Sequence, residues 1–575
     1  MLRTEVHDVS SGRRRTCVPT GLGAFLLTAL WTALALGQGP QAGQDAERGP
    51  AARRPSVVAD HPDSALAQVI ERLAGAPLEL EEAVRLALQN GTSVGEAEAA
   101  LRAAEAALRR ERGAFDPELF ASVERSSDDQ PTTSPFAGAD VLQEDAIATR
   151  AGIRTRLRFG TEIEAALESN RLETNSTFAA VNPEYRSSGR IDVRQPLLKG
   201  FGPAARDDLT AAEEGVRAAT AGVIDTRLGA RAAVEGLYWQ LYASERDLAV
   251  QRLIVEQARV FLEEVETRST AGLVGPNQVA NARVFLAEQE LAEIDREEQL
   301  DAVSDALAVL MGAPPEGRAV RYHPVTAPLR AVDVPPLATL VERALARNGE
   351  LAAARAELAA RRATARGARW DALPALDLVG SLGGSGLSGR GQEVSFGDQT
   401  FRADVEDGVG PSLSQVFDGD FPAWSIGLEV SVPIGLRDGR GERDRLRAEV
   451  ERAEQRLEAL RRDIEESVRA AHREAAHGAR RLAIAERGVD AAYEQVRIGL
   501  IEFENGRSTA FELVRLGADL AAAQQRLSAA LVRMARADAE LRRLTADAID
   551  TIGLDAAGID VEHTLDDQDD LEVRP

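Results

Sequence analysis

The amino-acid sequence predicts an α+β membrane protein built from a duplicated unit. Three observations carry this prediction. Segments in the first half of the chain recur in the same order in the second half, apolar residues repeat every seven positions over long stretches, and shorter stretches alternate between apolar and polar or charged residues. Heptad repeats are typical of long helices that pack side by side, and a period of two is typical of strands between an apolar and a wet environment.

The N-terminal residues predict export from the cytoplasm. Three arginines at positions 13–15 precede an apolar run over residues 21–36, and small and polar residues follow. This order is typical of a signal peptide, here residues 1–37; the alternative is a single N-terminal membrane anchor. The single cysteine, Cys17, precedes the apolar run, so the mature chain is expected to contain no disulfide.

The duplication divides the rest of the chain. Residues 77–312 form the first repeat and residues 336–548 the second, and residues 313–335 link them. Residues 38–76 are expected to be a flexible leader, because residues from about 38 to 62 are rich in proline, glycine and alanine. Residues 549–575 are acidic and are expected to form a disordered tail.

The two repeats correspond in sequence and in spacing. Residues 83–90 match residues 340–347 at an offset of 257, whereas the long helical segments match at an offset of 234, as Leu248 does with Leu482. The offset falls by 23 residues, mainly in the middle of each repeat. The first repeat therefore has the longer insertion there.

Apolar residues at seven-residue spacing mark a pair of long helices in each repeat. Glu293 interrupts the series once, and such seams predict that the two helices of a pair pack together. Glycines 215, 222, 229 and 236 are also seven apart, which indicates either a stripe for close helix approach or compositional drift. The heptad positions are Leu241, Leu248, Val255, Leu262, Val279, Leu286, Leu300 and Leu307, then Leu482, Val489, Val496, Phe503, Leu513, Leu520, Leu527, Met534 and Leu541.

Short turns are predicted between the paired helices. Residues 271–276 break the first pair and residues 505–509 the second. Pro276 suits the first position of the returning helix, where its missing N–H costs nothing. Thr509 and Glu512 have the spacing of a capping box, in which side chains satisfy free backbone amides.

Alternating residues predict strands in the middle of each repeat. One face is apolar and the other carries polar residues, in the first repeat many of them arginine and glutamate, which fits a barrel wall in lipid; a soluble antiparallel sheet is the alternative. No run of about 20 apolar residues follows the signal peptide, so a membrane crossing by helices is not expected. Residues 126–145 and 383–420 are expected to be loops. The strand candidates are residues 119–123, 150–159, 162–169 and 188–195 in the first repeat and 424–432 in the second.

Composition and motifs exclude several functional classes. The formal net charge of −25 argues against a nucleic-acid partner, which needs a basic face. His472 and His477 are five residues apart and point away from each other on a helix, so no metal site is predicted. The chain has no phosphate-binding loop and no nucleophile elbow, and Lys199 is expected only to orient a turn. We therefore expect no catalytic residue, no cofactor and no enzyme activity.

The doubled order of elements resembles the TolC-like outer membrane factor family over roughly residues 78–545. The segments that carry the resemblance are residues 80–90, 195–202, 238–239, 271–274 and 431–434. The resemblance implies a homotrimer whose strands close into one outer membrane β-barrel. It also implies that the long coiled-coil helices continue this barrel as a periplasmic α-barrel, so that the protein lies in the cell outer membrane with a large periplasmic portion.

The resemblance further implies a function. The chain would be the outer membrane channel of a tripartite efflux or type I secretion system, which passively conducts exported substrates from the periplasm to the exterior. The implied partners are outer membrane lipid, a periplasmic adaptor (membrane fusion) protein, and an inner membrane pump or ABC exporter. The alternative is a periplasmic coiled-coil adaptor or structural scaffold, which the two hairpins, each preceded by its own strands, disfavour.

Site residues follow from the resemblance as well. The family narrows its tunnel near the helix tips with acidic residues, a position that Glu512 occupies here. Arg515 stands where a second acidic residue is expected, so an ion pair between Glu512 and Arg515 at i, i+3 spacing is the alternative to a constriction. The tips implied to dock the adaptor are Gly272, Leu273 and Val274 in the first repeat and Gly506, Arg507 and Ser508 in the second.

The strand count departs from the family pattern. Two strands per repeat would give the twelve-stranded trimer of the family, but the first repeat offers up to four alternating segments. The extra hairpin would either join the wall and enlarge it or lengthen the surface side of the protein.

Overall fold

A computed structural model describes residues 62–133, 137–312, 321–329, 333–396, 399–505 and 507–547. All of them belong to one compact unit, Val58–Pro575. The predicted signal peptide, the leader up to residue 61, residues 313–320 and 330–332 of the linker and the acidic tail lie outside the described residues.

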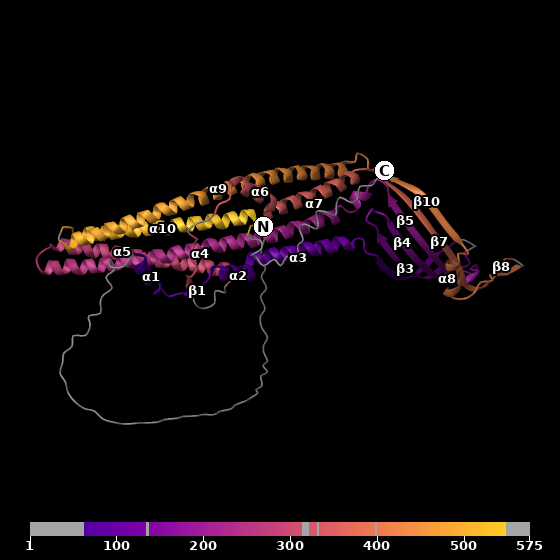
Figure 1. The fold of residues 1–575 in the computed structure, drawn as a ribbon. Coiled ribbons are helices and arrows are strands. Elements are labelled where there is room, and N and C mark those ends of the chain that lie inside the picture. The colour runs from indigo at the N-terminus through magenta and orange to yellow at the C-terminus, as the bar shows by residue number, and fades with distance from the viewer. Residues whose placement is uncertain are drawn as a thin grey trace, which may run out of the picture. The chain divides into compact units, whose positions relative to one another are not determined.

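The same order of elements occurs twice (Figure 1). Because each repeat contains both helices and a separate group of strands, the protein has an α+β structure. Each repeat has a short helix, a medium helix, a strand region and a long helical hairpin. The first repeat contains α2 (Leu80–Asn90), α3 (Thr92–Gly113), four strands, α4 (Asp207–Thr270) and α5 (Pro276–Leu310). The second contains α6 (Leu337–Arg347), α7 (Gly349–Asp371), β7 (Ala375–Gly391), β10 (Pro422–Ser431), α9 (Arg437–Glu504) and α10 (Ala510–Thr545).

The long helices pack through the apolar residues of the heptad series. With 64 and 68 residues, α4 and α9 are each about 100 Å long at 1.5 Å per residue. Leu248, Leu300 and Leu307 are buried in the first pair, and Leu482 and Met534 in the second. Glu293, which interrupts the series, accepts a hydrogen bond from Nε of Arg252 at 3.0 Å, so its charge is balanced across the hairpin.

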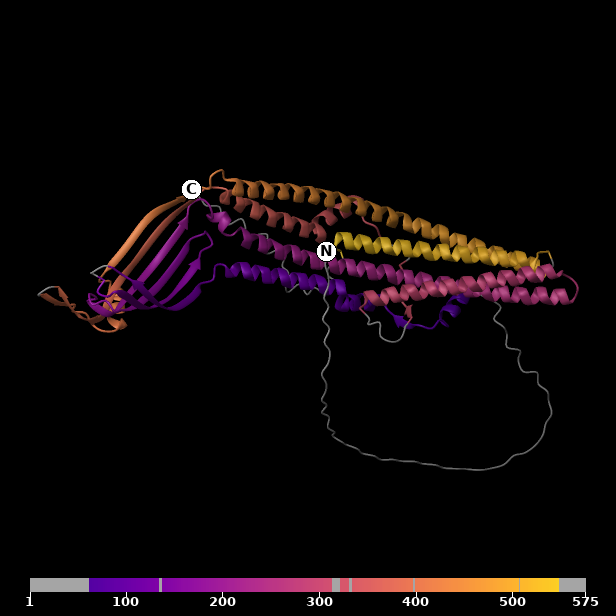
Figure 2. The same cartoon turned by 180° about the vertical axis from the view of Figure 1, so that it is seen from behind.

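The two repeats pack on one another along α4, which contacts α10 and α7 (Figures 1 and 2). A Cβ atom on Gly517 of α10 would lie 2.4 Å from Oε1 of Gln257, so these helices approach closely. At the predicted glycine stripe the result differs. Apart from the neighbouring backbone of α4 itself, no atom of the described residues lies within 4 Å of a Cβ built on Gly215, Gly222 or Gly229, so no other described helix packs closely against these three positions.

In each repeat two shorter helices lie along one long helix: α3 and α5 lie along α4, and α7 and α10 lie along α9. A Cβ atom on Gly312, just after α5, would lie 2.4 Å from the carbonyl oxygen of Asn90, so α5 ends against the junction of α2 and α3. The second repeat is similar, because Asp547, just after α10, pairs with Arg343 of α6 at 3.4 Å. The long helix of each repeat is continuous past both of these points.

Part of the predicted leader and linker is ordered structure. Residues 62–76 were expected to be flexible, but they include helix α1 (Pro62–Ile70), whose Leu66 is only 1% exposed. Strand β1 (Ala76–Leu78) pairs in parallel with β6 (Tyr322–Pro324), which lies within the expected linker. The physical reason is burial, because leucines of this segment belong to the apolar core that α4 contributes to.

Six strands form one antiparallel sheet, in the order β10-β7-β5-β4-β3-β2. All four strand candidates of the first repeat are in it. Their bounds are β2 (Glu118–Pro131), β3 (Val141–Arg156), β4 (Glu162–Thr174) and β5 (Val181–Pro196). Much of residues 126–145, expected to be a loop, therefore belongs to β2 and β3.

The region 383–420 is also more ordered than the sequence predicts. It contains the second half of β7, the hairpin of β8 (Glu393–Phe396) and β9 (Gln399–Arg402), and helix α8 (Val409–Asp418). Helix α8 lies directly on glycines of the sheet. A Cβ atom on Gly386 would be 2.0 Å from the carbonyl oxygen of Ser412, and one on Gly189 would be 2.8 Å from Cγ1 of Val416. The glycines are what allows the helix to come so close.

None of the helices in the described part of the chain has an apolar stretch long enough to cross a membrane.

Candidate functional site

The six-stranded sheet has one apolar and one ionic face. Residues that pair across neighbouring strands share a face, because side chains alternate along each strand. One row of paired residues is Leu119, Ile153, Ala165, Ile191, Leu382 and Trp424, and the adjacent row on the other face is Glu118, Arg154, Glu164, Asp192, Ser381 and Ser425. The alternation predicted from the sequence thus extends across all six strands.

Opposite charges pair across the strands of the ionic face. Arg154 holds Glu118 with two hydrogen bonds of 2.9 and 2.8 Å, which joins β3 to β2. Arg150 joins β3 to β4 through Glu164 at 2.5 Å. Arg194 of β5 bonds to two carboxylates, that of Asp377 on the neighbouring strand β7 at 2.8 Å and that of Glu429 on β10 at 2.7 Å. Except for the buried Asp377, these paired residues are exposed or half-buried, so the pairs fix strand register more than they add stability.

The ionic face lines a hollow of about 940 Å³ to which all six strands contribute side chains. Both signs of charge line it, as Arg154, Glu164 and Asp192 show. A hollow lined by paired charges can hold water and let solutes of either sign pass, and it offers no single cluster that would bind one of them tightly.

The tip of the first hairpin has the geometry that the sequence predicts. After α4 the backbone turns at Gly272, whose φ is +74°, a conformation that glycine adopts without strain. The amides of Gly272 and Leu273 donate to the carbonyls of Ser269 and Arg268, each at 2.9 Å, and so close the end of the helix. Leu273 is 73% exposed, so the tip presents an apolar side chain to its surroundings.

The tip of the second hairpin is polar. Arg507 is exposed and Ser508 half-buried, while Gly506, which the sequence also assigns to this tip, lies outside the described residues. The hydroxyl of Thr509 accepts a hydrogen bond from the amide of Glu512 at 3.2 Å, which caps α10 as predicted. Glu512 and Arg515 form an exposed ion pair at 3.4 Å. This ion pair is the arrangement that the sequence offers as the alternative to an acidic constriction of the tunnel.

The two hairpins meet near their tips. The guanidinium of Arg268, at the end of α4, lies 5.2 Å from the ring centroid of Phe503, at the end of α9. At this distance a guanidinium is attracted to the face of an aromatic ring. The apolar tip of the first repeat and the polar tip of the second are therefore parts of one end of the protein.

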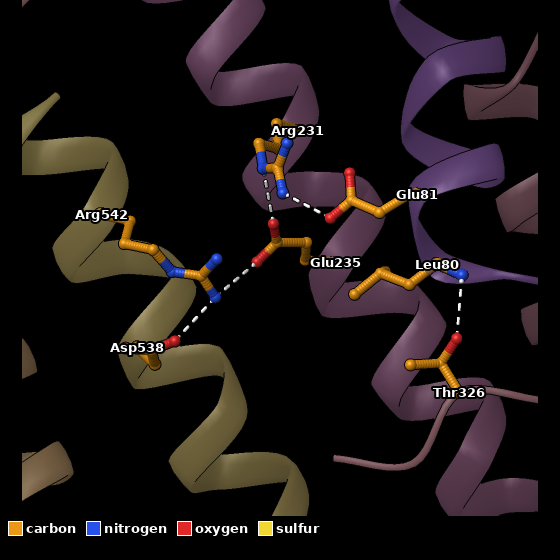
Figure 3. A network of polar contacts seen from close by, with 7 residues as sticks. All are labelled: Leu80, Glu81, Arg231, Glu235, Thr326, Asp538 and Arg542. Carbon is orange, nitrogen blue, oxygen red and sulfur yellow. Dashed lines mark hydrogen bonds and ion pairs between the residues drawn. The ribbon is translucent and has the colours of Figure 1, made fainter. Parts of the chain in front are cut away.

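A buried charge network joins the two repeats at the middle of the helices (Figure 3). Arg231 of α4 donates from Nε to Glu235 at 2.8 Å and from Nη2 to Glu81 of α2 at 2.8 Å. Arg542 of α10 reaches the second oxygen of Glu235 at 3.1 Å and Asp538 at 2.7 Å. The sequence alone does not predict this network, because Arg231 and Glu235 at i, i+4 spacing resemble an ordinary surface pair.

Burial sets the electrostatics of this network. Glu235 is 1% exposed and Arg231 6%. Burial raises the pKa of Glu235, and Arg542 and Arg231 oppose that shift. Two guanidinium groups are therefore what keeps a carboxylate in the interior of the helical part.

A half-buried carboxylate on α4, that of Asp247, predicts a dependence of stability on pH. Burial raises the pKa of Asp247 from 3.8 to about 6, and its Oδ1 has no hydrogen-bond partner among the described residues. The folded chain thus holds this proton more tightly than the unfolded chain, so stability falls as the pH rises from about 4 to 6. Asp247→Asn is expected to stabilise the protein at pH 7.5 by on the order of 2 kcal/mol, since one pKa unit is worth about 1.4 kcal/mol.

The measurement is the melting temperature of the purified variant at pH 4.5 and pH 7.5. The gain should be large at pH 7.5 and small at pH 4.5. Asp519→Asn, at an exposed position of α10, is the matched control and should change neither value. An equal gain for Asp247→Asn at both pH values would contradict the assignment.

The remaining predicted residues do not come together into a site. His472 and His477 lie on α9, the first half-buried and the second exposed. In residues 62–547, so far as the structure describes them, no group of three or more histidine, cysteine, aspartate or glutamate side chains could hold a metal ion. Lys199 is exposed in the turn that follows β5, where the sequence places it.

Comparison with known proteins gives one family and a set of similar folds. A family model described as "Outer membrane efflux protein" matches residues 83–313 and 340–547. A search of curated proteins finds no match to the chain.

Solved structures of outer membrane channels share the fold. The channel CmeC of Campylobacter jejuni is 14% identical in sequence, with a TM-score of 0.59, over 81% of this chain and 85% of CmeC. The outer membrane channel OprN is 18% identical, with a TM-score of 0.57, over 84% of this chain and 90% of OprN. The outer membrane protein VceC of Vibrio cholerae is 17% identical, with a TM-score of 0.57, over 81% of this chain and 95% of VceC.

Proposed function

This chain belongs to the outer membrane efflux protein family, and from that premise we propose that three copies of it assemble into one passive conduit. The protein is an outer membrane efflux channel, as the resemblance implies. The comparisons lend no support to the alternative of a periplasmic adaptor or scaffold.

The two-faced sheet is the observation that carries the proposal. Its apolar face suits lipid and its ionic face suits a water-filled lumen. Strands β2 and β10 are the edges of the sheet, and within the described residues neither has a partner on its outer side. In a bilayer, unpaired backbone groups cost several kcal/mol each, so a sheet in lipid has to close. Copies of this chain can close it by pairing β10 of one with β2 of the next.

The helices would continue the lumen into the periplasm. Apolar side chains remain exposed along the single chain, among them Leu291, Ile294 and Ile484. Exposed apolar surface of this extent is typical of protein–protein contacts. We assign these positions to contacts between neighbouring copies, in which the long helices pack as coiled coils around a tunnel.

The tips are assigned to the periplasmic adaptor protein, which in turn would dock on an inner membrane pump or ABC exporter. The tips lie at the end of α4 and α9 opposite to the sheet (Figure 2). Leu273 offers an exposed apolar anchor, and Arg507 and the Arg268–Phe503 pair offer polar contacts beside it. No catalytic step enters this function, and the cargo would be selected by the pump and not by the conduit.

Recovery and conductance of the purified protein test the proposal. The protein is expected in the outer membrane fraction, to migrate as a trimer on an unheated gel, and to give stable single-channel conductance in a planar bilayer. A monomer without conductance would reject the conduit.

Gly272→Val tests the tip assignment. Valine at a φ of +74° is strained by roughly 1–2 kcal/mol, and no described atom within 4 Å of the new Cβ adds a clash. The turn is expected to change and displace Leu273, so that export falls at least tenfold while trimer and conductance remain. Gly215→Ala, a helical glycine with equal space around it, is the control. Unchanged export in cells by Gly272→Val would count against adaptor docking at this tip.

A further inference from the structure

The extra hairpin of the first repeat, β3 and β4, lies inside the sheet. Strand β3 pairs with β4 from Arg156 and Glu162 at one end to Glu144 and Thr174 at the other. On its outer sides the hairpin pairs with β2 and with β5 over most of its length. Removing it from the sheet would break two ladders of backbone hydrogen bonds, one with β2 and one with β5.

The turn of this hairpin is fixed to the junction between sheet and helices. The amide of Gly202 donates to the carbonyl of Phe159 at 3.3 Å, and the hydroxyl of Thr161 bonds to the side chain of Gln195. Gly160 has a φ of +98°, and a Cβ on it would lie 2.5 Å from the carbonyl oxygen of Gly200. The hairpin therefore starts at the same level as the strands that are joined to helices.

Both faces of the sheet continue across the hairpin. Ile153 and Ala165 belong to the apolar row, and Arg154 and Glu164 to the ionic row. The ion pairs of Arg154 with Glu118 and of Arg150 with Glu164 lie on the ionic face. A hairpin that only extended the surface would be wet on both faces and would not need this alternation.

The edge strands have the directions that closure requires. Strand β2 follows α3 and runs away from the helices, whereas β10 runs back to α9. With an even number of strands per copy, β10 of one copy can pair antiparallel with β2 of the next.

We propose that the trimeric wall has eighteen strands, three times six, and not the twelve that the family resemblance implies. This inference rests on the proposed trimeric conduit. With strands about 4.8 Å apart and tilted by about 40°, twelve strands give a wall radius of about 12 Å and eighteen give about 18 Å. The cross-section enclosed by the backbone is then roughly twice as large.

The wider wall has a functional consequence. Strands β2, β5, β7 and β10 lead into helices α3, α4, α7 and α9, whereas β3 and β4 are joined only to strands. The hairpin therefore widens the exit and adds no helix to the tunnel. The barrel is then not the narrowest part of the path, and passage of bulky cargo is limited in the helical part alone.

Distances between spin labels on the three copies of the assembled protein measure the wall directly. A nitroxide is attached to Leu382→Cys, on the apolar face of β7, in a Cys17→Ser background. Backbone atoms at equivalent positions on a three-fold wall are separated by about 31 Å at a radius of 18 Å and by about 21 Å at 12 Å, as strand spacing and tilt require. Labels on this face point away from the lumen and lengthen both distances by the same amount, so the two walls differ by about 10 Å. Double electron–electron resonance resolves this difference.

Leu119→Cys on the apolar face of β2 is the second label site. Deletion of residues 132–180, which removes β3 and β4, is the reference for a twelve-stranded wall. At both sites the full chain is expected to give a distance about 10 Å longer than the deletion variant, because both sites lie on one wall. Equal distances in the two proteins would overturn the eighteen-stranded wall and leave the trimer intact. A protein with no distance between copies would instead reject the trimer, and the wall with it.

Discussion

Arg231→Met is expected to lower the free energy of unfolding by about 3–5 kcal/mol, the range for removing one partner from a buried ion pair. Glu235 is almost completely buried and would keep only Arg542 as a cationic partner. Glu81 would lose its bond to α4 as well. Because the network joins α2 and α4 of the first repeat to α10 of the second, the loss affects the packing of the repeats on each other.

The loss of stability is measured as the shift in the unfolding midpoint of the purified protein in detergent. Arg515→Met removes an exposed pair with Glu512 and is the matched control, with an expected effect under about 1 kcal/mol. The double variant Arg231→Met, Glu235→Leu should regain most of the loss, because apolar residues often replace a buried pair without cost. Equal midpoints for Arg231→Met and the control would show that the network does not stabilise the protein.

Ile426→Arg is expected to abolish recovery from the outer membrane. Ile426 lies in the middle of β10 on the apolar face and is 70% exposed in the single chain. An arginine on the lipid face costs about 2–4 kcal/mol near the bilayer midplane, and a trimer would carry three of them. The assembled protein in the outer membrane fraction, detected on an unheated gel, is the measurement.

Ser425→Arg is the control for this prediction, because Ser425 precedes Ile426 and belongs to the ionic face, bonded to Ser381 at 2.7 Å. An arginine there enters the hollow and meets the charged residues that line it. This variant should be recovered as a trimer. If both variants reach the outer membrane equally well, the apolar face does not face lipid.

Periodic side-chain patterns predicted most of the architecture. The heptads from Leu241 to Leu541 marked the helical pairs, and alternation of Ile153 with Arg154 or Ile426 with Ser425 marked strands and their faces. Both patterns are local properties of the sequence and reflect one buried or apolar face. Gly272 was assigned to a turn from sequence, and its positive φ agrees with that assignment.

Structure could not be predicted from the sequence where side chains do not alternate, or where a contact joins residues far apart in the chain. The second half of β7 contains Gly383, Gly384 and Gly386, which have no side chains to alternate, so it was expected to be a loop. Gly384 and Gly386 allow the close contact with α8, and Gly383 lies against the backbone of β5, which only the folded chain shows. Likewise, the residues near Glu235 in the sequence do not predict its ion pair with Arg542, which lies 307 residues further along the chain.

The division of each repeat into one continuous helix and two shorter ones has a mechanical consequence. A helix resists bending along its whole hydrogen-bonded length, whereas two helices that meet near Gly312 and Asn90 form a joint. In the proposed trimer, torque that a docked partner applies at the tips would be carried to the strands by α4 and α9 alone. The shorter helices would pivot near the level of Arg231 and Glu235, so the tip half of the proposed tunnel would be the part that opens while the strand half stays rigid.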